Sequence, residues 1–208
     1  MSLFITFEGG EGCGKSVQAR ALYRRLAKLA IPVLLTHEPG GTPLGKRIAR
    51  WLKWGEKIPP QTELLLFNAS RALLVAEVIQ PALNDGTTVI CDRFTDSTTA
   101  YQSYGRGLDL ATVRAVNHTA TQGLEPDLTV LLDIAAENGL ARKQDKKTDR
   151  FEQENIAFHQ KVRQGYLKLA NSEPKRWLVI DATLPKAKIA EIIAQKVKRL
   201  LAERGFKL

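Results

Sequence analysis

The residues with the clearest chemical potential lie near the start of the chain, in the stretch FEGGEGCGKS at residues 7–16. This stretch fits the pattern G-x-x-x-x-G-K-[ST], in which glycines let backbone N–H groups lie against phosphate oxygens. In such loops the lysine reaches the outer phosphates and the hydroxyl ligates Mg²⁺. A tight turn with an incidental lysine is the alternative, but a strand pattern precedes the loop and a helix pattern follows it. The residues predicted to hold a triphosphate are Gly9, Gly10, Glu11, Gly12, Cys13, Gly14, Lys15, Ser16 and Val17.

A second group of candidates lies in the stretch CDRFTDSTTAYQSYGRG, which begins at the end of the third apolar run. Asp92 is expected at the carboxyl end of a strand, where open parallel sheets bind ligands. Its carboxylate could hold Mg²⁺ through water, together with Ser16, while Arg93 offers a planar fork for phosphate. On local grounds alone, Asp92 and Arg93 could instead cap the next helix.

Weaker signals come from the stretch HEPGGTPLG and from the helical pattern beyond it. Glu38 places a second acid at the same rim of the sheet, although Pro-Gly-Gly is also common in ordinary turns. Phe67 and Arg71 are four residues apart, so a ring and a guanidinium project from one helix face. The local pattern favours Phe67 as a core residue and Arg71 as a surface residue.

The elements that must position these residues form an alternating series of short apolar runs and longer amphipathic segments. This alternation predicts an α/β fold, a five-stranded parallel sheet with helices on both faces. The strands are predicted near residues 3–7, 33–37, 87–91, 128–134 and 177–181. The helices are predicted around residues 22–29, 62–83, 111–122, 155–170 and 186–202.

The chain has 208 residues and an ordinary hydrophobic content of 44%, which suits one large domain over residues 1–208. Neither a repeat nor a linker divides it. The most polar stretch, RKQDKKTDR at residues 142–150, lies between helical patterns and is predicted to be a mobile lid.

The formal net charge of +9 predicts attraction to polyanions, which include nucleic acids, acidic membranes and phosphorylated metabolites. Part of the excess lies on the last predicted helix. Apolar residues recur there at helical spacing, so we expect one packed apolar face with a solvated basic face above it. Only two cysteines occur, so no disulfide framework is expected and a reducing cytoplasm suits the chain. We expect neither a signal peptide nor a membrane span.

Six segments, in this order and spacing, resemble the bacterial thymidylate kinase family, which belongs to the nucleoside monophosphate kinases. They are FEGGEGCGKS, EPGGT, DRFTDSTTAYQ, PDLTVLLD, DRFE and VIDAT. The family signature, a D-R pair followed by S-[ST]-x-A-Y-Q, is met by Asp92, Arg93, Ser97, Thr98, Ala100, Tyr101 and Gln102. The resemblance implies a P-loop NTPase fold with a short lid, ATP as phosphoryl donor, Mg²⁺, dTMP as acceptor and a homodimer.

The resemblance also implies individual roles. Phe67 would stack on thymine, Arg71 would hydrogen-bond its carbonyl, and Glu11 would accept from the sugar 3′-hydroxyl. Arg93 would clamp phosphate between donor and acceptor, and Tyr101 would crowd the place of a ribose 2′-hydroxyl. The residues implied to bind dTMP are Glu11, Glu38, Arg50, Phe67, Arg71, Arg93, Ser97, Tyr101 and Gln102.

Two departures from the family pattern concern phosphate-binding residues. Ala49 stands where the family commonly has an arginine for the acceptor phosphate, so Arg50 or Arg47 would have to substitute. The lid carries mostly lysines where the family generally has arginines. Lys146 or Lys147 is therefore expected to act in catalysis with Lys15 and Arg93, and Arg142 to contact ATP.

The resemblance implies transfer of the γ-phosphoryl group of ATP to the 5′-phosphate of dTMP. This reaction needs no general base, because a phosphate monoester is largely dianionic at neutral pH. The three histidines, His37, His118 and His159, are therefore expected to be ordinary polar residues. A kinase for another nucleotide or for a deoxynucleoside is one alternative. A nucleotide-driven DNA-binding protein is the other, although the chain lacks a D-x-x-G after the third strand and lacks interleaved aromatic and basic residues.

Overall fold

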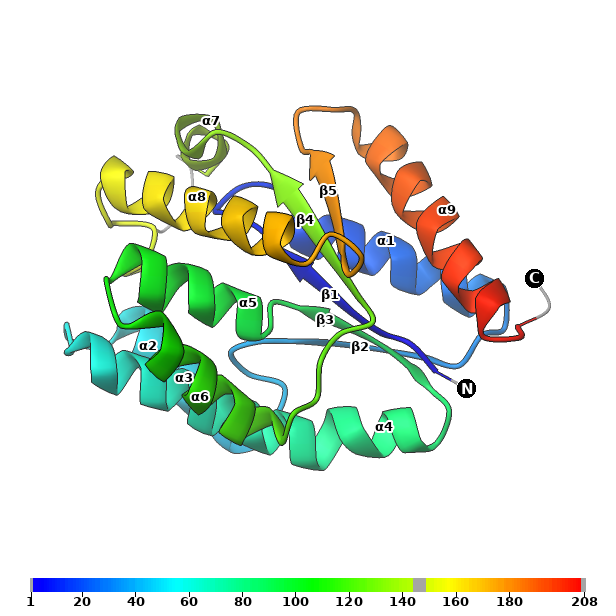
Figure 1. Ribbon diagram of the computed structural model, residues 1–208, viewed down its shortest axis with the longest axis horizontal. Helices are drawn as coiled ribbons and strands as arrows, with labels where there is room; N and C mark the ends of the chain where they lie inside the picture. Colours follow the sequence, from blue (N-terminus) through cyan, green and yellow to red (C-terminus); the bar gives the residue numbers. More distant parts are fainter. Residues whose placement is uncertain (1, 144–148, 207–208) are drawn as a thin grey trace.

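In the computed structural model, which describes residues 2–143 and 149–206, five strands form one parallel sheet (Figure 1). The strands are β1 (Phe4–Glu8), β2 (Val33–His37), β3 (Thr88–Asp92), β4 (Leu128–Asp133) and β5 (Trp177–Asp181). Their order across the sheet is β2-β3-β1-β4-β5. The strands predicted from apolar runs are confirmed to within one residue at each end, because a strand covered on both faces reads as an unbroken apolar run.

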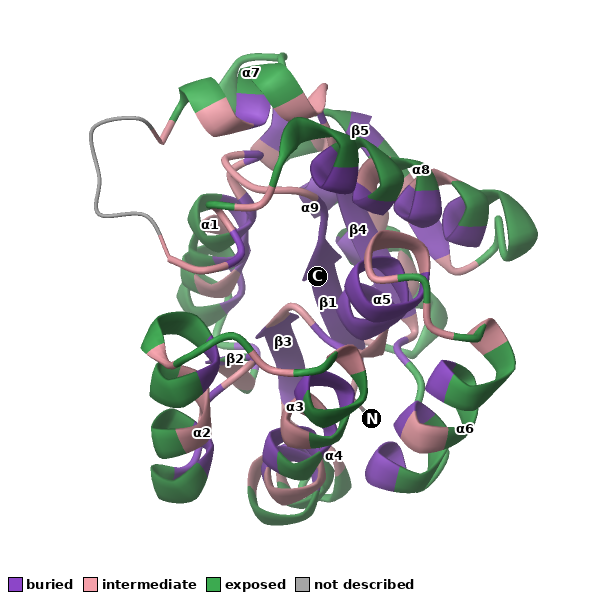
Figure 2. Cartoon of the chain, turned by 90° about the vertical axis from the view of Figure 1, so that its left-hand side faces the viewer, coloured by how far each residue is buried: buried purple, intermediate pink, exposed green. Residues whose placement is uncertain are grey.

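Helices cover both faces of this sheet, as predicted. The α-helices are α1 (Lys15–Lys28), α2 (Pro43–Trp54), α3 (Pro60–Leu74), α4 (Gln80–Asn84), α5 (Thr95–Thr98), α6 (Leu110–Thr121), α7 (Ala136–Ala141), α8 (Ile156–Ser172) and α9 (Lys186–Glu203). Two π-helical segments are η1 (Val75–Ile79) and η2 (Thr99–Gly105). Figure 2 shows buried residues on the strands and on the inward sides of the surrounding helices.

The core is split by the sheet, and β1 contributes to both sides. Ile5 and Phe7 pack with α1 and α9 on one face, whereas Phe4 packs with Leu74 and η1 on the other. A third cluster joins η2 to α8. In Figure 1, α1 and α9 lie together on one side of the sheet.

Two elements differ from the helices predicted by periodicity. The single helix expected over residues 62–83 begins at Pro60, ends at Asn84 and contains the π-helical turn η1 in its middle. The segment after Asp92 forms α5 and η2, and this second π-helical stretch carries Tyr101 and Gln102. A π turn shifts side chains relative to a 3.6-residue period, so an apolar pattern read at that period cannot reveal it.

The register of the sheet brings three loops together at its carboxyl edge. Asp92 pairs with Phe7 of β1 on one side and with His37 of β2 on the other. The glycine loop, the segment after His37 and the Asp92–Arg93 pair therefore leave the sheet side by side.

Candidate active site

A cavity of about 1220 Å³ opens at this carboxyl edge. One part of its wall consists of the glycine loop, the start of α1 and residues 182–189, and another part includes Phe67, Arg71 and the first turns after Asp92. Sites for one small molecule usually have about 300–1,000 Å³. The cavity is therefore large enough to hold more than a single small ligand.

The glycine loop, which is predicted to be an anion cradle, closes around the side chain of Lys15. The Nζ of Lys15 donates to the carbonyl oxygens of Gly9 at 2.9 Å and of Gly10 at 2.7 Å, so the buried ammonium lies inside the loop. Gly12 has a φ of 67°, and a Cβ there would lie 1.8 Å from the carbonyl oxygen of Gly139. Glycine is thus required at Gly12 both by its left-handed backbone and by the close approach of α7.

Ser16 and Asp92 meet at the mouth of this cradle. The Ser16 hydroxyl donates to the Asp92 carboxylate, which joins the start of α1 to the end of β3. Both residues line the cavity. Two hard oxygen ligands beside a phosphate cradle fit Mg²⁺, which binds through one or two protein groups and takes its other ligands from water and phosphate. No cluster of three or more His, Cys, Asp or Glu residues suited to a metal occurs in the described parts of the chain.

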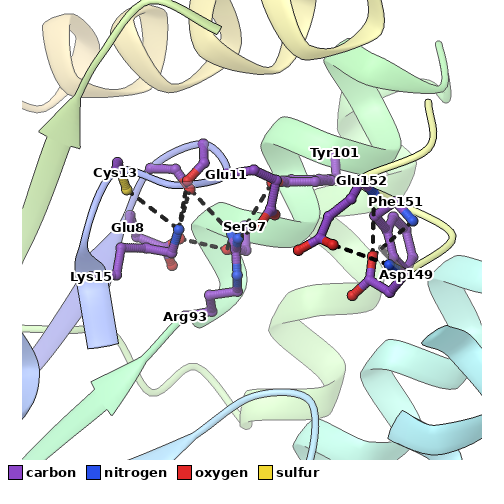
Figure 3. A network of polar contacts seen from close by, with 12 residues as sticks. Glu8, Glu11, Cys13, Lys15, Arg93, Ser97, Tyr101, Asp149, Phe151 and Glu152 are labelled. Atoms are coloured by element: carbon purple, nitrogen blue, oxygen red, sulfur yellow. Dashed lines mark hydrogen bonds and ion pairs between the residues drawn. The ribbon is translucent and has the colours of Figure 1, made fainter. Parts of the chain in front are cut away.

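Arg93 lies between the glycine loop and η2, as Figure 3 shows. Its φ of 74° is left-handed, which is strained for a residue other than glycine and is typical of functional sites. Nη1 donates to the Gly9 carbonyl at 3.2 Å and to Ser97 Oγ at 3.1 Å. The guanidinium also lies 5.2 Å from the ring centroid of Tyr101. These contacts hold the guanidinium of Arg93 against the glycine loop, and the N-cap of α5 is Phe94, without a side-chain cap hydrogen bond.

Glu11 connects the glycine loop to η2 and to the residues after α7. Its carboxylate accepts from Arg93 Nη2 at 2.7 Å, from the Tyr101 hydroxyl at 2.8 Å and from Lys143 Nζ at 2.8 Å. Burial opposes ionisation of this carboxyl, but the charges of Arg93, Lys15 and Lys143 outweigh burial and hold the pKa of Glu11 far below its usual range. Glu11 is therefore a fixed anion and a strong acceptor at the centre of the site.

Glu8 supports this arrangement from behind and was missed by sequence reasoning. Its buried carboxylate accepts from the backbone N–H of Phe94 at 2.7 Å, from Ser97 Oγ at 2.5 Å and from the Tyr166 hydroxyl at 3.0 Å. Burial, followed by the charge of Asp96, raises the pKa of Glu8 to about 7. The signal that could have found Glu8 is an acidic residue inside an otherwise apolar strand pattern.

Arg71 is buried and belongs to the cavity wall, so the local preference for a surface arginine was wrong. Its side chain is 1% exposed, and Nε and Nη2 donate to the Glu38 carboxylate at 2.9 and 2.6 Å. Nη1 donates to Asn68 and Asn117, and Nη2 also donates to Thr98 at 2.8 Å. A buried charge needs such a complete set of partners.

The aromatic wall near Arg71 contains the other residues implied by the family pattern. Phe67 is partly buried and its ring centroid lies 5.7 Å from that of Phe151, while Tyr101 packs against Phe151 at 6.2 Å. Ser97, Tyr101 and Gln102 all line the cavity. The structure therefore brings together side chains from between Phe67 and Phe151, which are far apart in the sequence.

The predicted arginine for the acceptor phosphate has no comparable position. Arg50 and Arg47 are exposed on α2 and are absent from the cavity lining, whereas Lys53, one turn further along the same helix, lines the cavity. The last turn of α2 is also joined to the residues before α8, because the backbone N–H of Arg150 donates to the Lys53 carbonyl at 3.1 Å. Lys53 was missed because sequence reasoning considered only positions next to Ala49.

The predicted lid lies only partly within the described residues. Lys146 and Lys147 lie outside them. Arg142 lines the cavity beside Leu184 and Lys186, and its Nη1 donates to the Ala182 carbonyl at 3.2 Å. Lys143, which was not predicted, bridges Glu11 and Glu152.

None of the helices within the described residues is both long enough and apolar enough to cross a lipid bilayer. Both cysteines, Cys13 and Cys91, are buried free thiols. Burial raises the pKa of the Cys91 thiol. This environment makes Cys91 an unreactive core residue.

Comparison with known proteins identifies the family of this chain. A sequence model described as thymidylate kinase matches residues 7–193. The thymidylate kinase of Dehalococcoides mccartyi (strain CBDB1) is 58% identical over 99% of this chain and 100% of that protein, and that of Thermomicrobium roseum is 49% identical over 99% and 98%. A crystal structure of thymidylate kinase from Ehrlichia chaffeensis superposes with a TM-score of 0.76 at 32% identity, over 96% of this chain and 98% of that one. The chain belongs to the thymidylate kinase family.

Proposed function

We propose that the protein transfers the γ-phosphoryl group of ATP to the 5′-phosphate of dTMP, giving dTDP and ADP for dTTP synthesis. Family membership supports this reaction. The observation that carries it is the position of Arg93, which in Figure 3 lies between Lys15 of the phosphate cradle and Tyr101 of the aromatic wall. One cavity thus offers a triphosphate site, a site for a base and sugar, and a cation between them.

The chemistry follows from the charge of the two substrates. The acceptor is already an oxyanion, so the barrier is repulsion between two polyanions that must meet in line. Lys15 neutralises the outer phosphates of ATP, and Arg93 forks onto oxygens of the transferred group. The lid, residues 142–150, excludes water that would otherwise hydrolyse ATP.

The acceptor site uses residues on the opposite wall. Phe67 stacks on thymine, Arg71 donates to its carbonyl, and Tyr101 excludes a ribose 2′-hydroxyl. Glu11, held as an anion by its cationic neighbours, accepts from the sugar 3′-hydroxyl. Arg71 has every N–H engaged, so the thymine carbonyl replaces one neutral acceptor such as Thr98.

Ser16 and Asp92 would hold Mg²⁺, and the bound ion would supply positive charge that neutralises the phosphates. Asp92→Asn should raise the Mg²⁺ concentration that gives half-maximal rate by about tenfold, the usual cost of losing a partner of the metal's ligands. Titration of the rate with Mg²⁺ at saturating ATP measures this. Asp133→Asn is the control, since Asp133 ends β4 at the same edge and pairs with Arg163 away from the cavity. Equal shifts in both variants would contradict the assignment.

Lys53 is the better candidate for the acceptor phosphate, because it lines the cavity and Arg50 does not. Lys53→Ala should raise the KM for dTMP by about tenfold, which is the size of one lost charge-assisted contact. Arg50→Ala, from the same exposed helix, should leave that KM nearly unchanged. The reverse result would return the role to Arg50, as the sequence pattern predicts.

Acceptor preference tests the function as a whole. ADP formation from ATP is measured with dTMP, dUMP, dGMP and dAMP, and dTMP should give the highest kcat/KM. A clear preference for a purine nucleotide would end the thymidylate assignment. Salt-dependent DNA binding without phosphoryl transfer would favour a nucleotide-driven DNA-binding protein instead. The homodimer and the cytoplasmic location stay predictions.

A further inference from the structure

Behind the aromatic wall lies a buried carboxylate that has no part in the reaction described above. Glu63, on α3, is 1% exposed and accepts from three side chains. Arg150 Nη2 donates to Oε2 at 2.8 Å, Arg106 Nε donates to Oε1 at 3.2 Å, and Gln102 Nε2 donates to Oε1 at 2.7 Å. Two of these three donors are guanidinium groups, which balance the buried charge.

This arrangement fixes the orientation of the Gln102 amide. A carboxylate paired with two guanidinium groups has no proton to donate, so it can face only the NH₂ end of an amide. The carbonyl end, Oε1, must then point away from Glu63. Gln102 is almost fully buried yet lines the cavity, and no hydrogen bond to its Oε1 is formed by any residue within the described parts of the chain.

We propose that Glu63 is a positioning residue that makes Gln102 present an acceptor, and not a donor, to the base of the nucleotide. The inference rests on the proposed function, in which Gln102 lines the base pocket. Thymine carries an N–H at N3 between two carbonyls, whereas cytosine carries a bare acceptor nitrogen at N3. An amide locked with its oxygen toward the pocket therefore accepts from thymine and leaves two acceptors facing each other with cytosine.

The neighbours of Glu63 indicate that a neutral isostere will be tolerated. Arg106 also donates to Glu154 at 2.5 Å and lies 4.6 Å from the ring centroid of Phe158. Arg150 also donates to the Leu52 carbonyl at 3.0 Å. Each guanidinium thus keeps a second anchor when the charge of Glu63 is removed.

The decisive variant is Glu63→Gln. Two guanidinium N–H groups, from Arg150 at 2.8 Å and from Arg106 Nη2 at 3.3 Å, donate to Oε2, so the new amide should turn its oxygen to that side. Its nitrogen then lies where Oε1 was, where Arg106 Nε loses its acceptor while Nη1 of the same guanidinium keeps Glu154. The new nitrogen donates to Gln102 Oε1, which reverses the Gln102 amide and presents NH₂ to the base. The ratio of kcat/KM for dTMP to that for dCMP should fall by roughly ten- to a hundredfold, the range for one mismatched buried hydrogen bond.

Glu154→Gln is the matched control, since it makes the same chemical change on the same Arg106 without touching Gln102. It should leave the dTMP to dCMP ratio unchanged. In Gln102→Leu the ratio should also fall, and adding Glu63→Gln to that variant should cause no further fall. Loss of activity toward dTMP in Glu63→Gln with an unchanged ratio would overturn the proposal and leave Glu63 a purely structural residue.

If Glu63→Gln does not fold, a crystal structure of the wild-type protein with dTMP decides the question. The proposal is supported by Gln102 Oε1 within hydrogen-bond distance of the base N3 and Nε2 on Glu63, and it is overturned by Gln102 turned away from the base. These outcomes are separable from failure of the proposed function, which would show as a wild-type protein that does not phosphorylate dTMP.

Discussion

Replacing Arg93 with alanine should lower kcat for the phosphorylation of dTMP by about 10³-fold or more, the scale known for arginines that stabilise transferring phosphoryl groups. The fork of Arg93 is held at the rim of the phosphate cradle by the Gly9 carbonyl and Ser97, at 3.2 and 3.1 Å. Its charge therefore acts where the two phosphate groups are proposed to meet, between Lys15 and Tyr101 in Figure 3. The KM for ATP should change much less, because Lys15 and the loop backbone remain.

Steady-state rates with both substrates saturating measure this effect, and thermal unfolding checks that the variant is folded. Arg93→Lys keeps the charge but loses the planar fork, so its kcat should lie between those of the wild type and Arg93→Ala. Arg25→Ala is the surface control, since Arg25 forms an exposed pair with Glu191. Near-normal turnover in Arg93→Ala would show that Arg93 holds structure and takes no part in phosphoryl transfer.

The positions of Lys15, Ser16, Asp92 and Arg93 could be predicted because Asp92 ends β3, Arg93 follows it, and Lys15 and Ser16 begin the helix after β1. In a parallel sheet the carboxyl ends of strands lie at one edge, so the strand pattern alone brings these residues together. The register then confirms it, with Asp92 beside both Phe7 and His37. Short local patterns were enough here because the fold itself supplies the long-range contacts.

The contacts that could not be predicted join residues with no shared local pattern. Lys143 reaches Glu11 across 132 positions of sequence, and Tyr166 reaches Glu8 across 158. Neither pair leaves a periodic or motif signal, since the pairs arise from the packing of α7 against the glycine loop and of α8 against the sheet. For Arg71 the local pattern predicted the wrong environment. Its helix position suggests an exposed side chain, but in the fold Glu38 from another loop packs against it and both side chains are buried.

Lys15→Ala should lower kcat by about 10²- to 10³-fold, the range measured when one preorganised donor to a developing charge is removed. The loss has two sources. The ammonium that would neutralise the outer phosphates of ATP is gone, and so are the hydrogen bonds that Nζ donates to the carbonyls of Gly9 and Gly10. Without them, those carbonyl dipoles keep their negative ends inside a cradle that must hold an anion.

The second source predicts weaker nucleotide binding as well as slower chemistry, so calorimetric titration with ADP and Mg²⁺ should show a raised Kd in the same variant. Lys28→Ala is the matched control, because Lys28 ends α1, the helix that Lys15 begins, and is exposed to solvent. That variant should keep the wild-type kcat and Kd, since the helix end lies outside the cavity lining. A Lys15→Ala protein with unchanged kcat would leave the phosphate cradle without its catalytic cation and would move that role to the lid.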